Sequence, residues 1–288
     1  MKNNKTKIRG LFRLVRFELP FTAGVCVILG EMLALGKLPD AREMILGFLS
    51  VFFISATALI LNDFFDLETD KINAPERPLP AGLVTKRDVV LFSCVVTVLG
   101  FIASSMLGFN ALLVVILVWA VGFLYNWRFK RTGLPGNLMV SFSVGMTFIF
   151  GGIAVAQPFE KTVWVFGIIV FLIDLGEEIA ADAMDVAGDK QAGSRSLAVL
   201  LGHEKALKIS AAIFLSVIVV SLLPFLIGWI EWFYIFPIIL MDIVIAYSTT
   251  KLLDSRSANR RIYIRAIYLS GMVAILILIA VKLMGSSL

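Results

Sequence analysis

The chain has 288 residues, of which 59% are hydrophobic and 16% are charged, whereas soluble domains carry about 25% charged residues. Its mean hydropathy of +0.92 excludes an ordinary soluble domain and predicts an integral membrane protein. The formal net charge is +5, but the positive residues follow the pattern of membrane orientation described below, so we expect no nucleic-acid partner.

Apolar runs of membrane-spanning length recur along the chain, since a helix needs about 20 apolar residues to cross the hydrocarbon core. In chain order they predict helices over residues 14–36, 41–64, 86–106, 110–127, 137–156, 162–180, 205–228, 231–252 and 261–284. We therefore expect an all-α membrane protein, a bundle of about nine transmembrane helices, in a single domain over residues 1–288.

The Lys and Arg residues are divided unevenly between the two sides of this bundle. Of the 26, 22 lie in or directly beside the N-terminal segment and the gaps after even-numbered helices, and 4 lie on the other side. Because Lys and Arg stay preferentially in the cytoplasm, the N-terminus is expected to be cytoplasmic and the C-terminus outside. This pattern is typical of a multi-pass protein of the cell membrane.

The first acidic motif lies at the end of the second predicted helix and contains Asn62, Asp63, Asp66 and Asp70. Asn62, Asp66 and Asp70 are four residues apart, so on a helix they form one stripe. Carboxylates this close repel one another unless a cation lies among them. Hard oxygen ligands suit Mg²⁺, which is usually shared with substrate phosphates.

The second acidic motif begins at the end of the sixth predicted helix, and its acids Glu178, Asp182, Asp185 and Asp189 step by four, three and four residues along one helical face. Solvated helix ends are the alternative interpretation, but two such stripes at equivalent places favour a functional site. The candidate metal ligands are Asn62, Asp63, Asp66, Asp70, Asp182, Asp185 and Asp189.

The two motifs indicate a weak internal repeat. Residues 66–71 align with 185–190, and an arginine follows each segment, Arg77 in one case and Arg195 in the other. A duplicated helix–loop–helix unit, over about 41–106 and 162–228, would bring two similar acidic sites to face each other. The match is short, so duplication and chance similarity both remain open.

These segments resemble the UbiA superfamily of intramembrane prenyltransferases. The resemblance lies in residues 62–70, 77–82, 182–189 and 194–198. It implies nine helices around a central cavity, with both motifs near the cytoplasmic face holding Mg²⁺ and a prenyl diphosphate. It also implies a catalytic role for Asp66, Asp70, Asp185 and Asp189.

Departure of diphosphate from an allylic carbon leaves negative charge that cationic side chains stabilise. Lys71, Arg77 and Arg195 lie in the motif loops and are favoured as phosphate ligands, with Lys130 and Arg16 as further candidates. Each of them is alternatively a residue that only obeys the positive-inside rule.

The allylic cation needs a dry cavity with aromatic walls, and Tyr125 is the best candidate for a cation–π contact. Its alternative is a tyrosine at the membrane interface. Asn126 either hydrogen-bonds a phosphate or caps a helix, and Asn62 is a further substrate-binding candidate. Asp174 and Asp242 lie within spans, and Asp174 ranks higher because it lies two turns before Asp182 on the same face.

The resemblance implies Mg²⁺-dependent transfer of a prenyl group from an isoprenoid diphosphate to a lipophilic acceptor. The second motif is most similar to the branch that makes archaeal ether lipids by joining geranylgeranyl diphosphate to geranylgeranylglyceryl phosphate, a step of phospholipid biosynthesis. Ala181 and Ala183 depart from that pattern, where bulkier or charged residues are expected. An aromatic, quinone-precursor acceptor is the alternative within the family, and a cation-coupled transporter is the alternative outside enzymes.

Overall fold

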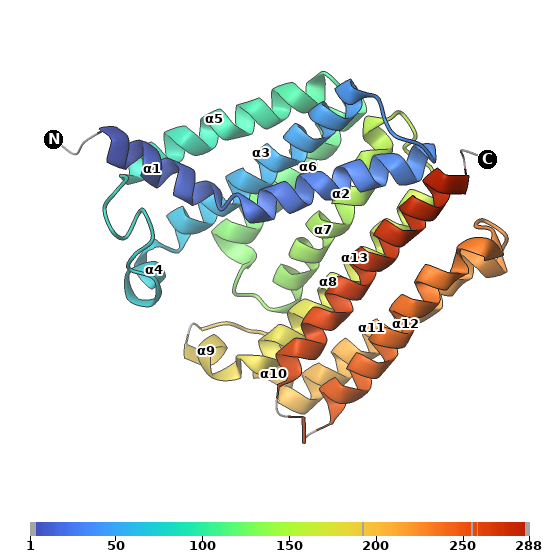
Figure 1. Ribbon diagram of the computed structural model, residues 1–288. Coiled ribbons are helices and arrows are strands. Elements are labelled where there is room, and N and C mark those ends of the chain that lie inside the picture. Colours follow the sequence, from blue (N-terminus) through green and yellow to red (C-terminus); the bar gives the residue numbers. More distant parts are fainter. Residues whose placement is uncertain (1–3, 192, 255, 258, 286–288) are drawn as a thin grey trace.

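The computed structural model describes residues 4–191, 193–254, 256–257 and 259–285, and within these ranges the regular structure is all helical (Figure 1). The long helices are α2 (Glu18–Leu35), α3 (Ala41–Phe65), α5 (Lys86–Ser105), α6 (Phe109–Leu124), α7 (Leu134–Ala154), α8 (Lys161–Met184), α11 (His203–Leu226), α12 (Ile235–Leu253) and α13 (Arg260–Gly285). The short elements are α1 (Asn4–Val15), α4 (Leu67–Asn73), α9 (Val186–Gln191), α10 (Leu197–Leu201), the π-helical turn η1 (Tyr125–Phe129) and the 3-10 turn η2 (Trp232–Tyr234).

Within the described ranges, eight long helices have the length and composition to cross a membrane. The ninth, α8, is as long as α11 but carries four acidic residues between Asp174 and Asp182. Helix α8 can carry these acidic residues because it packs between α7 and α11 and also contacts α13. Acidic residues in a span of this kind usually face the interior of the bundle. The predicted helical membrane bundle is thus confirmed.

The first predicted helix, over residues 14–36, is wrong at its start. The chain breaks at Arg16, whose φ of 47° is unusual for a residue other than glycine, and α1 and α2 are separate helices on either side of it. The sixth predicted helix, over 162–180, continues to Met184, so Asp182 is helical. Residue 16 is an arginine rather than a glycine or a proline, so the sequence does not mark the break.

Glycines let the backbones of α2 and α7 pack directly against each other. A Cβ on Gly30 of α2 would lie 2.4 Å from the Phe148 carbonyl oxygen, and one on Gly151 of α7 would lie 2.5 Å from that of Val27. Small residues at helix crossings permit this close packing in membranes, where van der Waals contact rather than water drives association.

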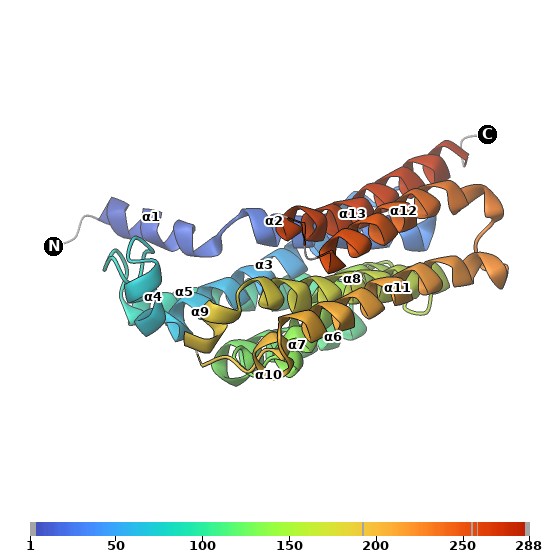
Figure 2. The same ribbon diagram turned by 90° about the horizontal axis from the view of Figure 1, so that it is seen from below.

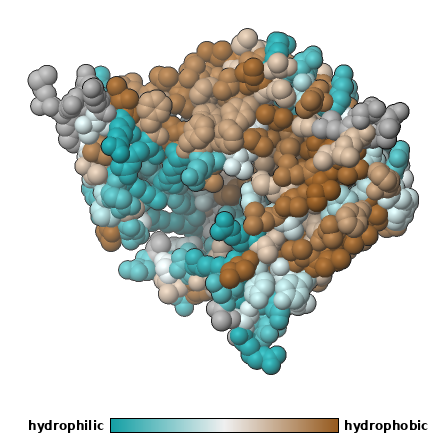
Figure 3. Space-filling view, viewed as in Figure 1, coloured by the Kyte–Doolittle hydropathy of each residue, from teal (hydrophilic) through white to brown (hydrophobic). Residues whose placement is uncertain are grey.

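The two acidic motifs belong to one end of the bundle. In both Figures 1 and 2, α1, α4 and α9 lie at that end, and the last turns of α13 lie at the opposite end. Figure 3 shows hydrophilic residues gathered over this part of the visible face, with a hollow among them. Each acidic motif spans a junction between a long helix and a short one, α3 to α4 and α8 to α9. The repeat and the single domain stay predictions.

Gly151→Ala should lower the melting temperature of the purified protein, because the new methyl group forces the α2 and α7 backbones apart at a cost of about 1–3 kcal/mol. Gly122→Ala is the matched control, since a Cβ there would lie 3.6 Å from the Ala58 Cβ, which is an ordinary van der Waals contact. Equal melting temperatures for the two variants would contradict the close approach.

Candidate active site

The first motif lies across the junction between α3 and α4. Asp66 separates the two helices, yet its backbone N–H donates to the Asn62 carbonyl at 2.9 Å, and the Asp70 N–H donates to Asp66 at 2.8 Å. Helical spacing therefore continues through the junction. Asn62, Asp66 and Asp70 keep the register that the sequence predicted.

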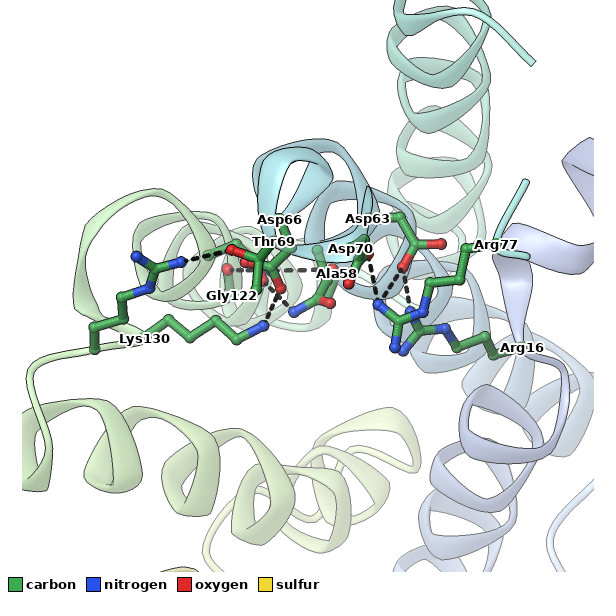
Figure 4. Close-up of polar contacts among 12 residues, drawn as sticks. Arg16, Ala58, Asp63, Asp66, Thr69, Asp70, Arg77, Gly122 and Lys130 are labelled. Carbon is green, nitrogen blue, oxygen red and sulfur yellow. Dashed lines mark hydrogen bonds and ion pairs between the residues drawn. The ribbon is translucent and has the colours of Figure 1, made fainter. Parts of the chain in front are cut away.

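Two arginines neutralise one side of this motif. Asp63 forms ion pairs with Arg16 and, at 3.6 Å, with Arg77, whose guanidinium also donates to Asp70 at 2.6 Å (Figure 4). Asp63 is 1% exposed and Asp70 is 5% exposed, so both carboxylates depend on these partners. Burial alone would lower the pKa of Arg77, but its hydrogen bond to Asp70 and the nearby negative charges raise it, so Arg77 stays charged.

On the other side of the motif, Lys130 forms an ion pair with Asp66 (Figure 4). Lys130 follows the π-helical turn η1, where its N–H donates to the Tyr125 carbonyl at 2.8 Å. Such turns are rare and frequently occur at functional sites. The Asn62 side-chain amide lies 3.0 Å from Asn126 Oδ1, a contact that joins α3 to the same turn. Asn62 and Asn126, two of the substrate-binding candidates from the sequence, therefore lie next to each other.

The second motif does not form one continuous helical stripe, and that prediction is wrong. Helix α8 ends at Met184, and Asp185 has φ −130° and ψ 33°, so the chain turns before α9 begins. Asp182 accepts a hydrogen bond of 2.9 Å from Asn137 on α7. Asp185 is exposed, and Asp189 buries its Oδ2 without a hydrogen-bond partner among the described residues.

A largely apolar cavity of about 560 Å³ lies in the bundle, within the range of about 300–1,000 Å³ typical of ligand sites. Residues of α2, α3, α6, α7, α8 and α13 line it. Its polar lining residues include Asn62, Tyr125 and Asn126, together with Glu178 of the second motif. The predicted central cavity is therefore present, and residues of both motifs reach it.

A second, more polar cavity of about 570 Å³ lies between α8, α9 and α13. Asp182, Asp185 and Asp189 line it on one side, and Arg261 and Arg265 line it on the other. Glu177 and Tyr268 line both cavities. These two side chains therefore stand where the apolar and the polar spaces adjoin.

The remaining sequence candidates lie in different surroundings. Lys71 pairs with exposed Glu68 at 2.8 Å, and this hydrogen bond lowers the pKa of Glu68. The Arg195 backbone N–H donates to the Arg131 carbonyl at 2.9 Å, which holds its loop against the loop of Lys130.

The two acids predicted within spans differ as their ranking implied. Asp174 lines the apolar cavity and accepts a hydrogen bond of 2.8 Å from Ser141. Asp242 accepts hydrogen bonds from Ser221 instead and is absent from the lining of both cavities.

Sequence reasoning missed five residues around these cavities: Asn137, Glu177, Arg261, Arg265 and Tyr268. Glu177 stands directly before Glu178 and interrupts an apolar span, which is a usable signal. The two arginines belong to the basic end of the last helix, where the positive-inside rule accounts for them without a binding role.

The acidic side chains are not gathered around one point. In the described part of the chain, no three Asp, Glu, His or Cys side chains form a group ready to hold a metal ion. Asp63, Asp66 and Asp70 are instead turned to Arg16, Arg77 and Lys130. The assignment of individual metal ligands stays a prediction.

Comparison with known proteins identifies the family. The model of the UbiA prenyltransferase family matches residues 23–281. Digeranylgeranylglyceryl phosphate synthase of Thermococcus gammatolerans is 31% identical over 257 residues, which cover 88% of this chain and 92% of that protein. The enzyme of the same name from Pyrococcus furiosus is 32% identical over 255 residues, covering 88% and 91%.

Solved structures agree with this assignment. A structure of digeranylgeranylglyceryl phosphate synthase superposes with a TM-score of 0.85 at 27% identity, covering 95% of this chain and 98% of that one. A UbiA homologue from Archaeoglobus fulgidus, bound to GPP and Mg²⁺, shares the fold with a TM-score of 0.68 at 18% identity, covering 95% and 99%. The chain thus belongs to the UbiA prenyltransferase family and is a multi-pass membrane enzyme that acts on an isoprenoid diphosphate.

Proposed function

We propose that the chain transfers a geranylgeranyl group from geranylgeranyl diphosphate to geranylgeranylglyceryl phosphate in a Mg²⁺-dependent reaction. The observation that carries this proposal is the apolar cavity, which Asn62 of the first motif and Glu178 of the second both line. An apolar cavity suits the prenyl chain, and the basic and acidic side chains at the motif end suit its diphosphate.

The acidic residues fit a magnesium ion. They offer carboxylate and amide oxygens, which are hard ligands of the kind that Mg²⁺ selects. Asp189 buries a carboxylate oxygen without a hydrogen-bond partner in the described ranges, and such an oxygen is suited to a cation. Asp66, Asp70, Asp185 and Asp189 would hold the metal, with Asn62, Asp63 and Asp182 as further ligands. The chemistry that Mg²⁺ supplies when bound is stabilisation of the charge on the diphosphate.

In the proposed reaction, the acceptor hydroxyl oxygen bonds to C1 of the prenyl group while the C1–oxygen bond to the diphosphate breaks. The bonding electrons leave with the diphosphate, and the hydroxyl proton is released. Arg77 and Lys130, with Arg16 beside them, orient the diphosphate and offset its charge. Tyr125 faces the allylic carbon from the cavity wall, and the apolar lining keeps water from the cation.

The acceptor is the part of the proposal that relatives support most directly. Several proteins more than 30% identical over most of the chain are named digeranylgeranylglyceryl phosphate synthases. The two departures from the expected motif have different surroundings. Ala183 is buried at 3% exposure in the core, whereas Ala181 lines the polar cavity and leaves space there. Product analysis with glycerol-phosphate ethers and hydroxybenzoate separates this acceptor from an aromatic one.

Asp66→Ala and Asp185→Ala should each lower prenyl transfer by at least about 100-fold, because each removes a carboxylate that holds the metal beside the diphosphate. Transfer is measured as Mg²⁺-dependent release of diphosphate from labelled geranylgeranyl diphosphate in the presence of acceptor. Glu68→Ala is the control, since Glu68 is exposed and pairs with Lys71 at the same loop. Normal rates in either aspartate variant would refute the metal assignment.

Arg77→Ala should raise the dissociation constant for the donor diphosphate by about ten- to a hundredfold and leave acceptor binding little changed, since a hydrogen bond to a charged group contributes about 1.5–3 kcal/mol. Binding of a non-reactive thiolodiphosphate analogue measures the donor alone. Arg13→Ala is the control, because the Arg13 guanidinium donates to the Glu76 carbonyl at 3.2 Å and forms no ion pair with a motif aspartate within the described residues. Equal losses for donor and acceptor would count against this role.

The motif end of the bundle is proposed to face the cytoplasm, with the N-terminus on the same side. In a variant without Cys26 and Cys94, cysteines that replace Arg131 and Arg256 should react with an impermeant label only from the cytoplasmic side. A cysteine that replaces Lys37, in the gap between α2 and α3, should react from the opposite side. Labelling of all three from one side would overturn the orientation.

A further inference from the structure

Helix α1 is attached to the bundle along one of its faces. Gly10 and Leu14 are four residues apart and therefore lie on the same face. Leu14 is 0% exposed, and a Cβ on Gly10 would lie 2.9 Å from the Val84 side chain. Near the start of the helix, Lys7 forms an ion pair of 2.6 Å with Asp88 of α5. The position of α1 on the protein is therefore fixed by packing and by charge.

The other faces of α1 carry an apolar stripe beside a basic one. Ile8 and Phe12 are four residues apart, and they are 54% and 72% exposed. Arg9 and Arg13 are also exposed, and their stripe lies one residue further along, about 100° around the helix. Neither arginine forms an ion pair within the described residues, and α1 contains no Asp or Glu. This pattern is typical of helices that lie at a membrane surface.

The direction of α1 agrees with such a position. Its 12 residues give a helix of about 18 Å, too short to cross a hydrocarbon core of about 30 Å. The break at Arg16 lets α1 leave the direction of α2. In Figure 1, α1 runs across the direction that α5 and α13 share, at the motif end of the bundle. When the long helices cross the membrane, α1 therefore lies along its surface.

The exposed apolar surface continues from α1 onto the spans. Phe17, directly after the break, is 61% exposed, and Phe21 of α2 is 45% exposed. The ring of Phe17 stacks on that of Phe21 at 5.5 Å and packs against that of Phe52 of α3 at 5.4 Å. Exposed aromatic side chains on membrane spans face lipid. Ile8 and Phe12 thus extend a lipid-facing surface rather than form an isolated patch.

We propose that α1 is an anchor at the membrane surface, in which Ile8 and Phe12 insert among the lipid tails and Arg9 and Arg13 bind anionic phospholipid headgroups. Basic side chains at a membrane surface are attracted by anionic lipids. Arginine suits this contact because its planar guanidinium forms two parallel hydrogen bonds with a phosphate. The inference is independent of which acceptor the enzyme uses.

The anchor is connected to the first acidic motif. The Arg13 guanidinium donates to the Glu76 carbonyl at 3.2 Å, and Arg77 is the next residue in that loop. Arg16, directly after α1, forms an ion pair with Asp63. An anchored α1 therefore keeps two cations of the first motif close to the lipid headgroups, at the depth where a membrane-bound prenyl diphosphate carries its charge.

The first test measures the depth of α1 in the full-length protein, in nanodiscs of phosphatidylcholine and phosphatidylglycerol. In a variant without Cys26 and Cys94, a nitroxide label is attached to Phe12→Cys or, as the control, to Thr6→Cys. Thr6 is exposed and lies on another face of α1. The label at residue 12 should be relaxed by oxygen and shielded from a water-soluble nickel chelate, and the label at residue 6 should show the reverse. Preference of both labels for the chelate would overturn the insertion.

The second test measures which lipids the protein immobilises, with spin-labelled phosphatidylglycerol and phosphatidylcholine as the probes. The wild type should select phosphatidylglycerol, and Arg9→Gln/Arg13→Gln should lower this selectivity at least about twofold. Arg9→Lys/Arg13→Lys should retain most of it because the charge remains. Arg256→Gln is the control, since Arg256 is an exposed arginine paired with Asp254. Unchanged selectivity in the glutamine double variant, or an equal loss in Arg256→Gln, would show that α1 does not bind the headgroups.

Discussion

A carboxylate buried near the end of a membrane helix is costly unless a positive charge lies beside it, and this constraint organises the site. Asp63 and Asp70 are nearly inaccessible to solvent, and Asp66 lies between them in sequence at the end of α3. Their partners come from three separate places. Arg16 comes from the break between α1 and α2, Arg77 from the loop after α4, and Lys130 from the residue after η1.

These ion pairs connect local conformation to chemistry. The positive φ of Arg16 and the π-helical turn before Lys130 are both departures from regular helix, and both deliver a cation to the first motif. Strained or irregular backbone of this kind persists where surrounding contacts hold it, and it concentrates at functional sites. In the proposed reaction, a diphosphate bound there would meet cations that the fold already brings to the first motif.

The sequence predicted the membrane bundle, the helical spacing of the first motif and the ranking of Asp174 over Asp242, because apolar length and four-residue spacing are properties of the chain itself. It could not predict the break at Arg16 or the turn at Asp185, since no glycine or proline stands at either residue. Nor could it find Arg261 and Arg265. The positive-inside rule assigns a cation to one side of the membrane and says nothing of which acid or phosphate it meets.

The two acidic motifs differ in whether basic side chains neutralise their aspartates. The three aspartates of the first motif are all paired with basic side chains of the chain, whereas Asp182 is hydrogen-bonded to Asn137 and no ion pair of Asp185 or Asp189 occurs in the described part of the structure. Acids without a basic partner attract cations, and arginines without an acidic partner attract anions. A cavity with such acids on α8 and α9 and such arginines on α13 is therefore suited to a ligand that brings both charges, a phosphate together with its metal ion.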